Sequence, residues 1–281
     1  MTSTTGDVAP RVQRVQWLGL PTDQHSSHRR GPARAPAALR QMRDDYAQWG
    51  NDATERGPEI GHDFVWHDLG DLPLDRSGEA DRLAIVAAAA AAAPRGPLLS
   101  IGGDHSVTYP LVEGLAQRHG PLNVLHFDAH PDLYELLGDD PLSHASPFAR
   151  LLERGLVGRL VQVGIRASNR HQREQARRFG VTTVEANDFV AGAVPLPPAP
   201  LYVSIDLDAL DPAFAPGVSH VEPGGLTVRD VLRVLRRIDV PVVAGDIVEY
   251  NPLTDVRSAT AVVAMKLAKE LAACMLLPPA A

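Results

Sequence analysis

The feature that most limits how this chain can fold is a repeated alternation of short apolar runs with longer helical patterns. The runs read "RVQWLGLP", "DFVWHDLGD", "PLLSIGG", "LNVLHFDAH", "RLVQVGIR", "PLYVSIDLDAL" and "PVVAGDIVEYNP". Helical patterns lie between them, at Asp81–Ala93, Tyr109–Arg118, Arg170–Phe179, Val228–Arg237 and Ala259–Leu276. Strands that alternate with helices form a parallel sheet covered on both faces. We therefore predict an α/β fold with three layers.

Nothing in the chain marks a domain boundary. Its 281 residues are 44% hydrophobic, which is enough for a large core. The proline-rich "VPLPPAP" (Val194–Pro200) directly precedes a strand and is typical of a rigid lead-in loop. We predict one domain over residues 1–281.

Composition excludes several classes of function. The net charge is −7 and no dense Lys/Arg cluster is present, which argues against a nucleic-acid partner. The only cysteine, Cys274, excludes an internal disulfide and a thiolate metal cluster, and we expect it to pack inside a helix. The N-terminus lacks a secretory pattern, and the apolar run Leu83–Ala93 is too short to span a bilayer. We expect a cytoplasmic protein without a membrane partner.

Polar residues follow several of the predicted strands, where ligands bind in parallel sheets. These residues are Asp104 and His105 after "SIGG", Asp128, His130 and Asp132 after "LHF", Asp206 and Asp208 after "YVSI", and Glu249 after "VVAGDIV". Acids and imidazoles are thus expected at one edge of the sheet.

The spacing of these residues suggests convergence on cations. Asp128, His130 and Asp132 occupy alternate positions, and alternate positions on a strand share a face, so we expect the three side chains to converge on one point. A hydrogen-bonded polar cluster, or a set of helix caps, is the alternative. Asp206 and Asp208 repeat the arrangement, and facing carboxylate pairs repel unless cations lie between them.

Oxygen and imidazole donors without thiolate suit Mn²⁺ or a similar first-row ion better than structural zinc. Shared carboxylates suggest two ions, which in hydrolases typically lie about 3.5–4 Å apart. Asp211 precedes a proline and is expected to be a turn or cap residue. Such a site supplies hydroxide near neutral pH for attack on an amide, a guanidine or an amidine. The residues by themselves thus indicate metal-assisted hydrolysis and leave the substrate open.

The motifs "GGDHS", "FDAHPD" and "SIDLDALDPAFAPG" resemble, in order and wording, the metal-binding motifs of the ureohydrolase family, which contains arginases and agmatinases. The resemblance covers nearly the whole chain. "HPDLY", "SHASPFAR", "REQARRFGV" and "PGVSHVEPGGL" are most similar to the plant-type arginases. The resemblance implies the three-layer arginase-like fold and homo-oligomers, trimers or hexamers.

The same resemblance implies a site with two Mn²⁺ ions per chain, for which Ni²⁺, Co²⁺ or Fe²⁺ could substitute. One ion would be held by His105, Asp128, Asp132 and Asp206, and the other by Asp128, His130, Asp206 and Asp208. Asp128 and Asp206 would bridge the two ions. Asp104 is not a ligand in the family pattern, so a turn role or a role behind the ligands is expected.

Two further residues acquire roles through the resemblance. Glu249 in "VEYNP" would accept parallel N–H bonds from the guanidinium of the substrate. His144 in "SHA" would exchange protons near the metals, and either His144 or Asp132 would protonate the leaving nitrogen. A surface loop histidine is the alternative for His144. His28 and His171 have no such support and are expected to be solvated.

The substrate tail is predicted less directly. Where this chain has Tyr134, animal arginases have an asparagine, and where it has Ala167, Ser168 and Asn169 they have acidic residues. Plant-type arginases show similar departures, so we predict L-arginine, converted to L-ornithine and urea. Agmatine, guanidinobutyrate or guanidine is the alternative. Two other classes stay open: a non-catalytic metal-binding subunit, and a single-zinc deacetylase of similar fold.

Overall fold

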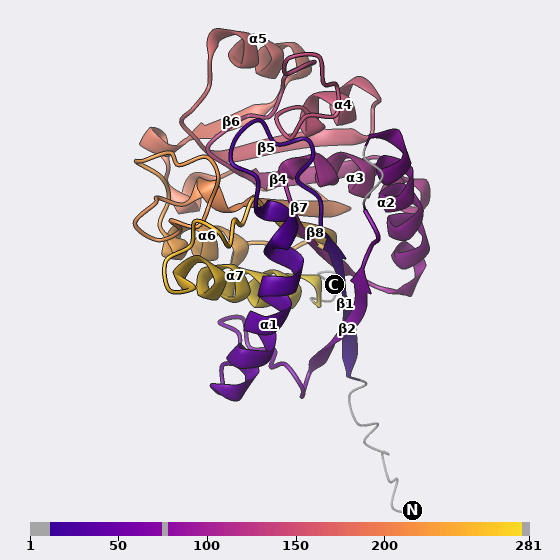
Figure 1. The fold of residues 1–281 in the computed structure, drawn as a ribbon, viewed down its shortest axis with the longest axis vertical. Helices are drawn as coiled ribbons and strands as arrows, with labels where there is room; N and C mark the ends of the chain where they lie inside the picture. Colours follow the sequence, from indigo (N-terminus) through magenta and orange to yellow (C-terminus); the bar gives the residue numbers. More distant parts are fainter. Residues whose placement is uncertain (1–11, 75–77, 277–281) are drawn as a thin grey trace, which may run out of the picture.

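The computed structural model describes residues 12–74 and 78–276, which contain one sheet of eight parallel strands in the order β2-β1-β3-β8-β7-β4-β5-β6 (Figure 1). The strands are β1 (Gln13–Leu20), β2 (Phe64–Asp71), β3 (Leu98–Gly102), β4 (Leu122–Phe127), β5 (Val157–Ile165), β6 (Thr182–Glu185), β7 (Leu201–Asp206) and β8 (Val242–Val248). The predicted parallel sheet is confirmed.

Helices cover both faces of the sheet (Figure 1). The helices are α1 (Ala35–Gln48), α2 (Glu79–Ala92), α3 (Thr108–His119), α4 (Pro147–Glu153), α5 (Arg170–Phe179), α6 (Val228–Leu235) and α7 (Ala259–Met275). Helices α1, α6 and α7 share one hydrophobic core with the sheet, and α2, α3 and α4 share the other. The three predicted layers are therefore present.

Strand β7 illustrates why such a sheet forms. All of its side chains are buried, with Tyr202 in one core and Val203 in the other. Successive side chains of a strand point to opposite faces, so a central strand needs apolar residues at consecutive positions. A polar side chain inside such a strand needs a buried partner, as Ser204 of β7 has in Asp246, whereas the carboxyl ends of the strands lie at the edge of the sheet where a ligand can bind.

Several elements were not predicted. The edge strand β6 has only four residues, "TTVE", which alternate between half-buried and exposed and carry no long apolar run. The helix α1 "APAALRQMRDDYAQ" begins with a proline near its N-terminus and buries only its Leu39, Met42 and Tyr46 stripe together with its first turn. The short α4 follows a long loop. Within the described part of the chain, every helix falls short of the length and apolar character needed to cross a bilayer.

Candidate metal centre and adjoining pocket

The central strands bring the predicted site residues together. Neighbours β3, β8, β7 and β4 end side by side. A polar residue stands at or directly after the last position of β8, β7 and β4, and Asp104 is the second residue after the end of β3. Asp206 is the last residue of β7, whereas Asp128 and Glu249 follow β4 and β8 directly. His105 begins a short 3₁₀ helix, His105–Val107, which continues into α3.

One set of residues, the inner cluster, surrounds the imidazole of His105. The Nδ1 atom of His105 lies 3.1 Å from Asp128 Oδ2, 3.0 Å from Asp132 Oδ2 and 3.3 Å from Asp206 Oδ2. All of these side chains are buried. Among the described residues, this Nδ1 atom has no hydrogen-bond partner of acceptable geometry. Three carboxylate oxygens and one imidazole nitrogen converging on a buried point suit a divalent cation.

The residues behind His105 show which ring nitrogen is unprotonated and offers its lone pair to the cluster. The hydroxyl of Ser204 donates to Asp246 Oδ1 at 2.6 Å, so its oxygen accepts from His105 Nε2–H at 2.9 Å. Thr108 and Tyr202 also donate to Asp246, at 2.6 Å each. With the proton on Nε2, the lone pair of Nδ1 points at the three carboxylates, as metal ligation requires.

A second set, the outer cluster, consists of Asp128, His130 and Asp208. The Nδ1 atom of His130 lies 3.0 Å from Asp208 Oδ2 and 3.4 Å from Asp128 Oδ1. The side chain of His130 is 24% exposed, whereas that of His105 is fully buried. Asp128 thus offers Oδ2 to the inner cluster and Oδ1 to the outer cluster, the arrangement expected of a bridging carboxylate.

The charges in these clusters require compensation. Burial, followed by the repulsion of Asp208 and Asp128, raises the pKa of Asp206 well above its usual value. Burial also raises the pKa of Asp208 to about 6, against the attraction of His130. Burial lowers the pKa of His105, but its three carboxylate neighbours outweigh this and raise it overall. Without cations, protons on the Asp206 carboxyl and on the His105 imidazole offset part of the negative charge, and bound metal would replace those protons.

The backbone at the site departs from the predicted strand geometry. Asp128, His130 and Asp132 do not continue β4, which ends at Phe127, so their supposed alternation along a strand is wrong. Asp132 has φ = 51° and Glu249 has φ = 63°, both in the left-handed region that costs a non-glycine residue about 1–3 kcal/mol. The loop therefore turns His130 and Asp132 to different clusters, which a straight strand would not do.

Glu249 lies beside the inner cluster with one oxygen free. Its Oε1 accepts the backbone N–H of His105 at 2.9 Å and lies 3.3 Å from His144 Nδ1. Its Oε2 is buried and has no hydrogen-bond partner in the described part of the protein. Burial tends to raise the pKa of Glu249, but contact with His144 lowers it overall, so the carboxylate stays charged. A buried, charged oxygen without a partner is suited to a cationic ligand.

His144 is buried, so the alternative of a surface loop histidine is wrong. Its Nε2 lies 2.9 Å from the hydroxyl of Ser27, and its ring stacks on His220 at 5.0 Å between centroids. Burial by itself lowers the pKa of His144, but the contact with Glu249 raises it to about 9. Ser27 and His220 were not singled out as site residues, since each comes from a distant loop whose position only the fold provides.

A pocket of about 530 Å³ opens onto both clusters and Glu249. The residues that line it are Ser27, His130, Asp132, Tyr134, Leu137, His144, Ala145, Arg166, Ala167, Ser168, Asn169, Gln172, Asp206, Asp208, His220, Glu222 and Glu249. Tyr134 and the segment Ala167–Asn169, the positions that depart from the animal pattern, therefore lie on its wall.

The structure also tests the predictions for Asp104, Asp211, two histidines and Cys274. Asp104 caps the 3₁₀ helix by accepting the Ser106 N–H at 3.2 Å, and Asp211 accepts backbone N–H groups within its own loop, so both act as turn residues as predicted. His28 and His171 are exposed, and Cys274 is buried within α7.

Comparisons with known proteins give a consistent result. A family model described as "Arginase family" matches residues 13–274. The chain is 44% identical to a protein named "Arginase 1, mitochondrial" of Oryza sativa subsp. indica, over 91% of this chain and 80% of that protein. It is 35% identical to a guanidinopropionase of Pseudomonas aeruginosa, over 97% of this chain and 89% of that one. The solved structure of arginase from Medicago truncatula is similar with a TM-score of 0.85 and 38% identity, over 94% of this chain and 88% of that chain.

Proposed function

Because the chain belongs to the arginase family, we propose that it is a metal-dependent ureohydrolase that converts L-arginine to L-ornithine and urea. The observation that carries the proposal is the free, buried Oε2 atom of Glu249 directly beside a convergence of carboxylates on His105 Nδ1. The first feature suits a guanidinium and the second suits metal ions. The two together are what hydrolysis of a guanidino group requires.

The proposed cofactor is a pair of Mn²⁺ ions, with Ni²⁺, Co²⁺ or Fe²⁺ as substitutes. His105, Asp128, Asp132 and Asp206 would hold one ion, and Asp128, His130, Asp206 and Asp208 the other. The donor set consists of oxygen and imidazole nitrogen, which suits these ions. When bound, two such ions activate water for attack on an unreactive carbon and stabilise the negative charge that develops.

Glu249 would bind and orient the substrate. Its Oε1 is already held by the backbone N–H of His105, so the carboxylate cannot rotate freely. Its Oε2 can accept a charge-assisted N–H bond from the guanidinium and fix the guanidinium carbon next to the clusters. The left-handed backbone at Glu249 is the strain expected of a residue held in a functional orientation.

His144 would move protons. Its Nδ1 contacts the carboxylate of Glu249, which stabilises the protonated ring. Its Nε2 contacts the hydroxyl of Ser27, to which a proton can be passed. A pKa of about 9 keeps it protonated at neutral pH, ready to donate to the departing nitrogen. Asp132, which also lines the pocket, is the other candidate for this proton transfer.

The wall of the pocket favours arginine over guanidino acids that lack an amino group. Glu222 presents a carboxylate that is 40% exposed, and Ser168 and Asn169 add neutral polar groups. The α-ammonium group of arginine can pair with Glu222, whereas guanidino acids without an amino group bring only a carboxylate that this residue repels. The nearby cation Arg166 is engaged by backbone carbonyls, including those of Asp208 and Glu222. Hydrolysis of a guanidino acid is the second candidate, because of the 35% identity to the guanidinopropionase.

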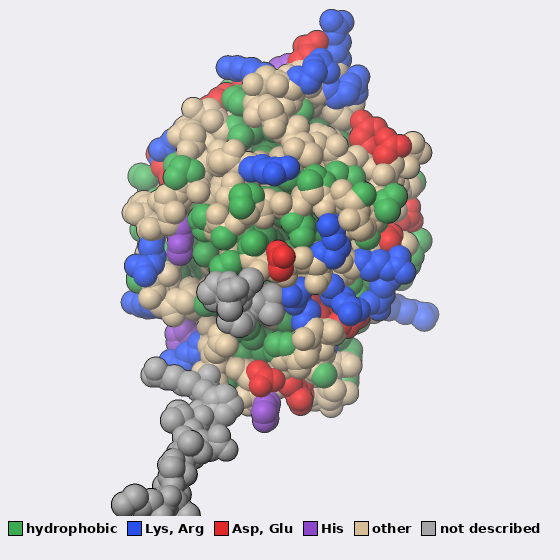
Figure 2. Space-filling model, turned by 180° about the vertical axis from the view of Figure 1, so that it is seen from behind, with side chains coloured by type: hydrophobic (Ala, Val, Ile, Leu, Met, Phe, Trp, Pro, Cys, Tyr) green, Lys and Arg blue, Asp and Glu red, His purple; other side chains and the backbone are tan. Residues whose placement is uncertain are grey.

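The proposal also covers the assembly, the cellular location and the partners of the protein. We propose a homo-oligomer, a trimer or a hexamer, that acts in the cytoplasm as a single domain over residues 1–281 and binds neither nucleic acid nor membrane. The net charge of −7 supports the absence of a nucleic-acid partner. Figure 2 shows a face on which basic and acidic side chains both occur among hydrophobic ones. Agmatine is the alternative substrate and is compared directly with arginine.

The test is a urea-release assay on purified full-length protein, chelated and reloaded with Mn²⁺. Arginine, agmatine, 3-guanidinopropionate and 4-guanidinobutyrate are compared side by side, and bound metal is counted by elemental analysis. We expect two ions per chain and the highest kcat/KM for arginine. A higher kcat/KM for another guanidino compound would identify that compound, and not arginine, as the preferred substrate. One zinc ion per chain with deacetylation, or metal binding without any urea release, would contradict the proposal itself.

Glu249→Gln separates substrate binding from metal binding. Loss of one charge-assisted bond costs about 1.5–3 kcal/mol, so kcat/KM should fall roughly 10- to 150-fold for every guanidino substrate. The metal content should not change, since Glu249 is outside both clusters. The matched control is Glu174→Gln, which removes a carboxylate on α5 that forms a surface ion pair with Arg170. Unchanged turnover in Glu249→Gln would remove this residue from its proposed role.

A further inference from the structure

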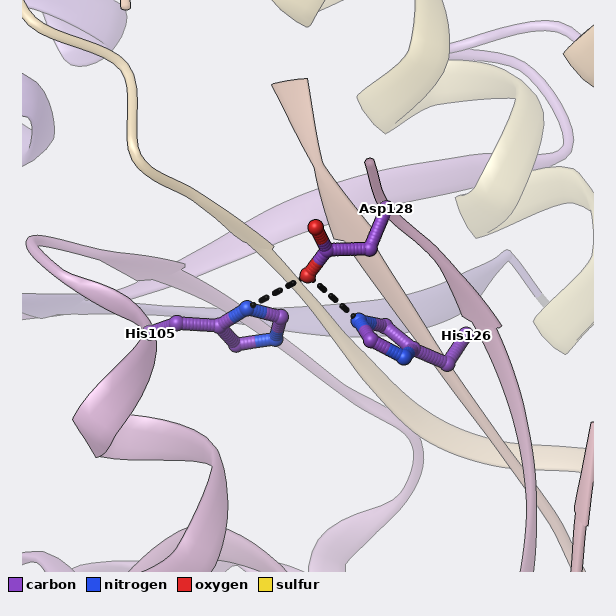
Figure 3. A group of neighbouring side chains, drawn as sticks. All are labelled: His105, His126 and Asp128. Atoms are coloured by element: carbon purple, nitrogen blue, oxygen red, sulfur yellow. Dashed lines mark hydrogen bonds and ion pairs between the residues drawn. The ribbon is translucent and has the colours of Figure 1, made fainter. Parts of the chain in front are cut away.

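His126 is a buried imidazole at the inner cluster that the sequence motifs did not single out. It lies on β4, two residues before Asp128, and is fully buried. Its Nε2 lies 2.7 Å from Asp128 Oδ2, the same oxygen that faces His105 Nδ1 (Figure 3). Distances alone allow two roles: His126 could be an additional nitrogen ligand of the metal, or it could donate a hydrogen bond to the carboxylate.

Gln162 on the neighbouring strand distinguishes the two roles. Gln162 is paired with His126 in the register of β4 and β5. Its Nε2 donates to the carbonyl oxygen of Pro131 at 2.6 Å and lies 3.1 Å from His126 Nδ1. A carbonyl oxygen only accepts hydrogen bonds, so the amide must present its NH₂ group at this side. The flipped amide would place two acceptors, Gln162 Oε1 and Pro131 O, against each other.

The orientation of the amide decides the tautomer of His126. The second hydrogen of the NH₂ group points at His126 Nδ1, which must then be the unprotonated ring nitrogen. The proton of the neutral ring is therefore on Nε2, where it is donated to Asp128. A ring protonated on both nitrogens would place an N–H group against the NH₂ group of Gln162. A protonated Nε2 has no lone pair for a metal.

We propose that His126 is a positioning residue, locked by Gln162 as the neutral Nε2–H tautomer, that orients Asp128 and does not ligate the metal itself. The inference rests on the proposed metal site, for which Asp128 is the carboxylate shared by both clusters.

The contacts of Asp128 show what this lock does. Oδ2 accepts from His126, and Oδ1 accepts the backbone N–H of His130 at 2.6 Å. Each oxygen thus has one fixed donor behind it and one direction free for a cation, so the carboxylate cannot rotate about its own axis. Gln162 also holds the carbonyl of Pro131, between the cluster residues His130 and Asp132. One amide therefore steadies both the shared carboxylate and the loop that follows it.

Phe148 completes the arrangement. Its ring packs on His126 with centroids 4.1 Å apart, and it also contacts the ring of His105 edge-on at 5.4 Å. Phe148 is fully buried and excludes water from this side of the cluster. Hydrogen bonds in such a dry environment are strong and directional, so removing one donor should lower the affinity for metal.

The first experiment reads the tautomer in the wild-type full-length protein. Long-range ¹H–¹⁵N correlation of ¹⁵N-histidine-labelled protein is recorded metal-free and loaded with diamagnetic Zn²⁺, and the His126 signals are identified by their loss in His126→Gln. We expect an Nε2–H pattern in both states. An Nδ1–H pattern, or a coordination shift of His126 Nε2 on Zn²⁺ loading, would overturn the inference.

The second experiment measures Mn²⁺ affinity by competition with a chelator. His126→Leu removes the donor and should weaken binding about 10- to 100-fold, whereas His126→Gln keeps an N–H donor and should retain affinity within about tenfold. Gln162→Leu removes the donor to His126 Nδ1 and to the Pro131 carbonyl, and should weaken binding less than His126→Leu does. Gln16→Leu is the matched control, since it removes another buried glutamine, whose side chain donates to the carbonyls of Ala92 and Gly96. Equal losses in His126→Leu and His126→Gln would contradict the positioning role.

The two proposals fail separately. Wild-type protein that binds no Mn²⁺ would overturn the proposed function, whereas the metal-free spectrum still reports the tautomer. A correct metal count with the wrong tautomer would overturn only the inference about His126.

Discussion

The inner and outer clusters share Asp128 but differ in how firmly their imidazoles are held. His105 is fully buried, faces three carboxylates, and is tied through Ser204 to Asp246. His130 is 24% exposed on the pocket wall and lies near two carboxylates of its own cluster. A ligand fixed on its far side loses little freedom when metal binds, whereas a mobile ligand loses more. We call the proposed ions of the two clusters the inner ion and the outer ion. We therefore expect the inner ion to bind more tightly and the outer ion to exchange first.

The largest expected effect comes from the residue that both clusters share. Asp128→Asn should empty both positions, because each cluster loses a negative oxygen. Urea release should fall on the order of 10³-fold or more, since several kcal/mol of metal-derived charge stabilisation are lost. Elemental analysis and the urea assay measure this, with Asp188→Asn on the surface as the control for loss of one charge. Retention of one tightly bound ion would show that the clusters do not depend on Asp128 equally.

Ser204→Ala tests whether the inner cluster owes its tighter binding to the fixed orientation of His105. Of the two cluster imidazoles, the hydroxyl of Ser204 contacts that of His105, so the affinity of the inner ion should drop about 10- to 100-fold while the outer ion is little affected. Chelator competition with Mn²⁺ measures both steps. Ser100→Ala is the matched control, since the buried hydroxyl of Ser100 on β3 has no hydrogen-bond partner within residues 12–74 and 78–276. An equal loss of Mn²⁺ affinity at both clusters would contradict the expected difference between them.

A smaller effect is expected from the pH dependence of the metal-free protein. Contact with Glu249 raises the pKa of His144 from 6.5 to about 9 in the folded state. The folded state therefore binds this proton more tightly than the unfolded state, and the resulting stability is fully present below pH 6.5 and lost as pH rises through about 9. The midpoint of thermal unfolding should fall across this window, by about 2–4 °C for each kcal/mol lost. In His144→Asn that part of the decline should disappear; an identical pH profile would refute the ion pair.

The smallest effect is expected at the pocket mouth. Glu222 Oε1 lies 3.8 Å from His130 Nε2, and its side chain is 40% exposed. An exposed pair of this kind contributes about 0–1 kcal/mol, so Glu222→Gln should change outer-ion affinity less than about fivefold. The KM for arginine should rise, while that for guanidinobutyrate should stay level or fall because a repulsive carboxylate is gone. An unchanged ratio of the two KM values would remove Glu222 from substrate selection.

Much of the fold and of the candidate site was predictable because burial imposes a simple pattern on a parallel sheet. Central strands must be apolar on both faces, so the first charged residues after "LHF" and "YVSI" mark the strand ends. Strands that run parallel end at one edge, which is why Asp128 and Asp206 could be expected to meet. Short or amphipathic elements such as β6 and α1 lack that pattern, because one side of them faces water.

The residues by themselves determined the kinds of ligand, their order along the chain and the class of sheet that carries them, because these follow from residue chemistry and local periodicity. Only the tertiary structure decided which nitrogen of each imidazole faces the cluster. Ser204 sets the orientation of His105, and Gln162 sets that of His126, through hydrogen bonds between elements that are separate in the chain. The left-handed turn at Asp132 and the approach of the Ser27 loop to His144 are likewise products of packing. Hydrogen-bond direction depends on the neighbour that the fold supplies, and no spacing within one strand can encode it.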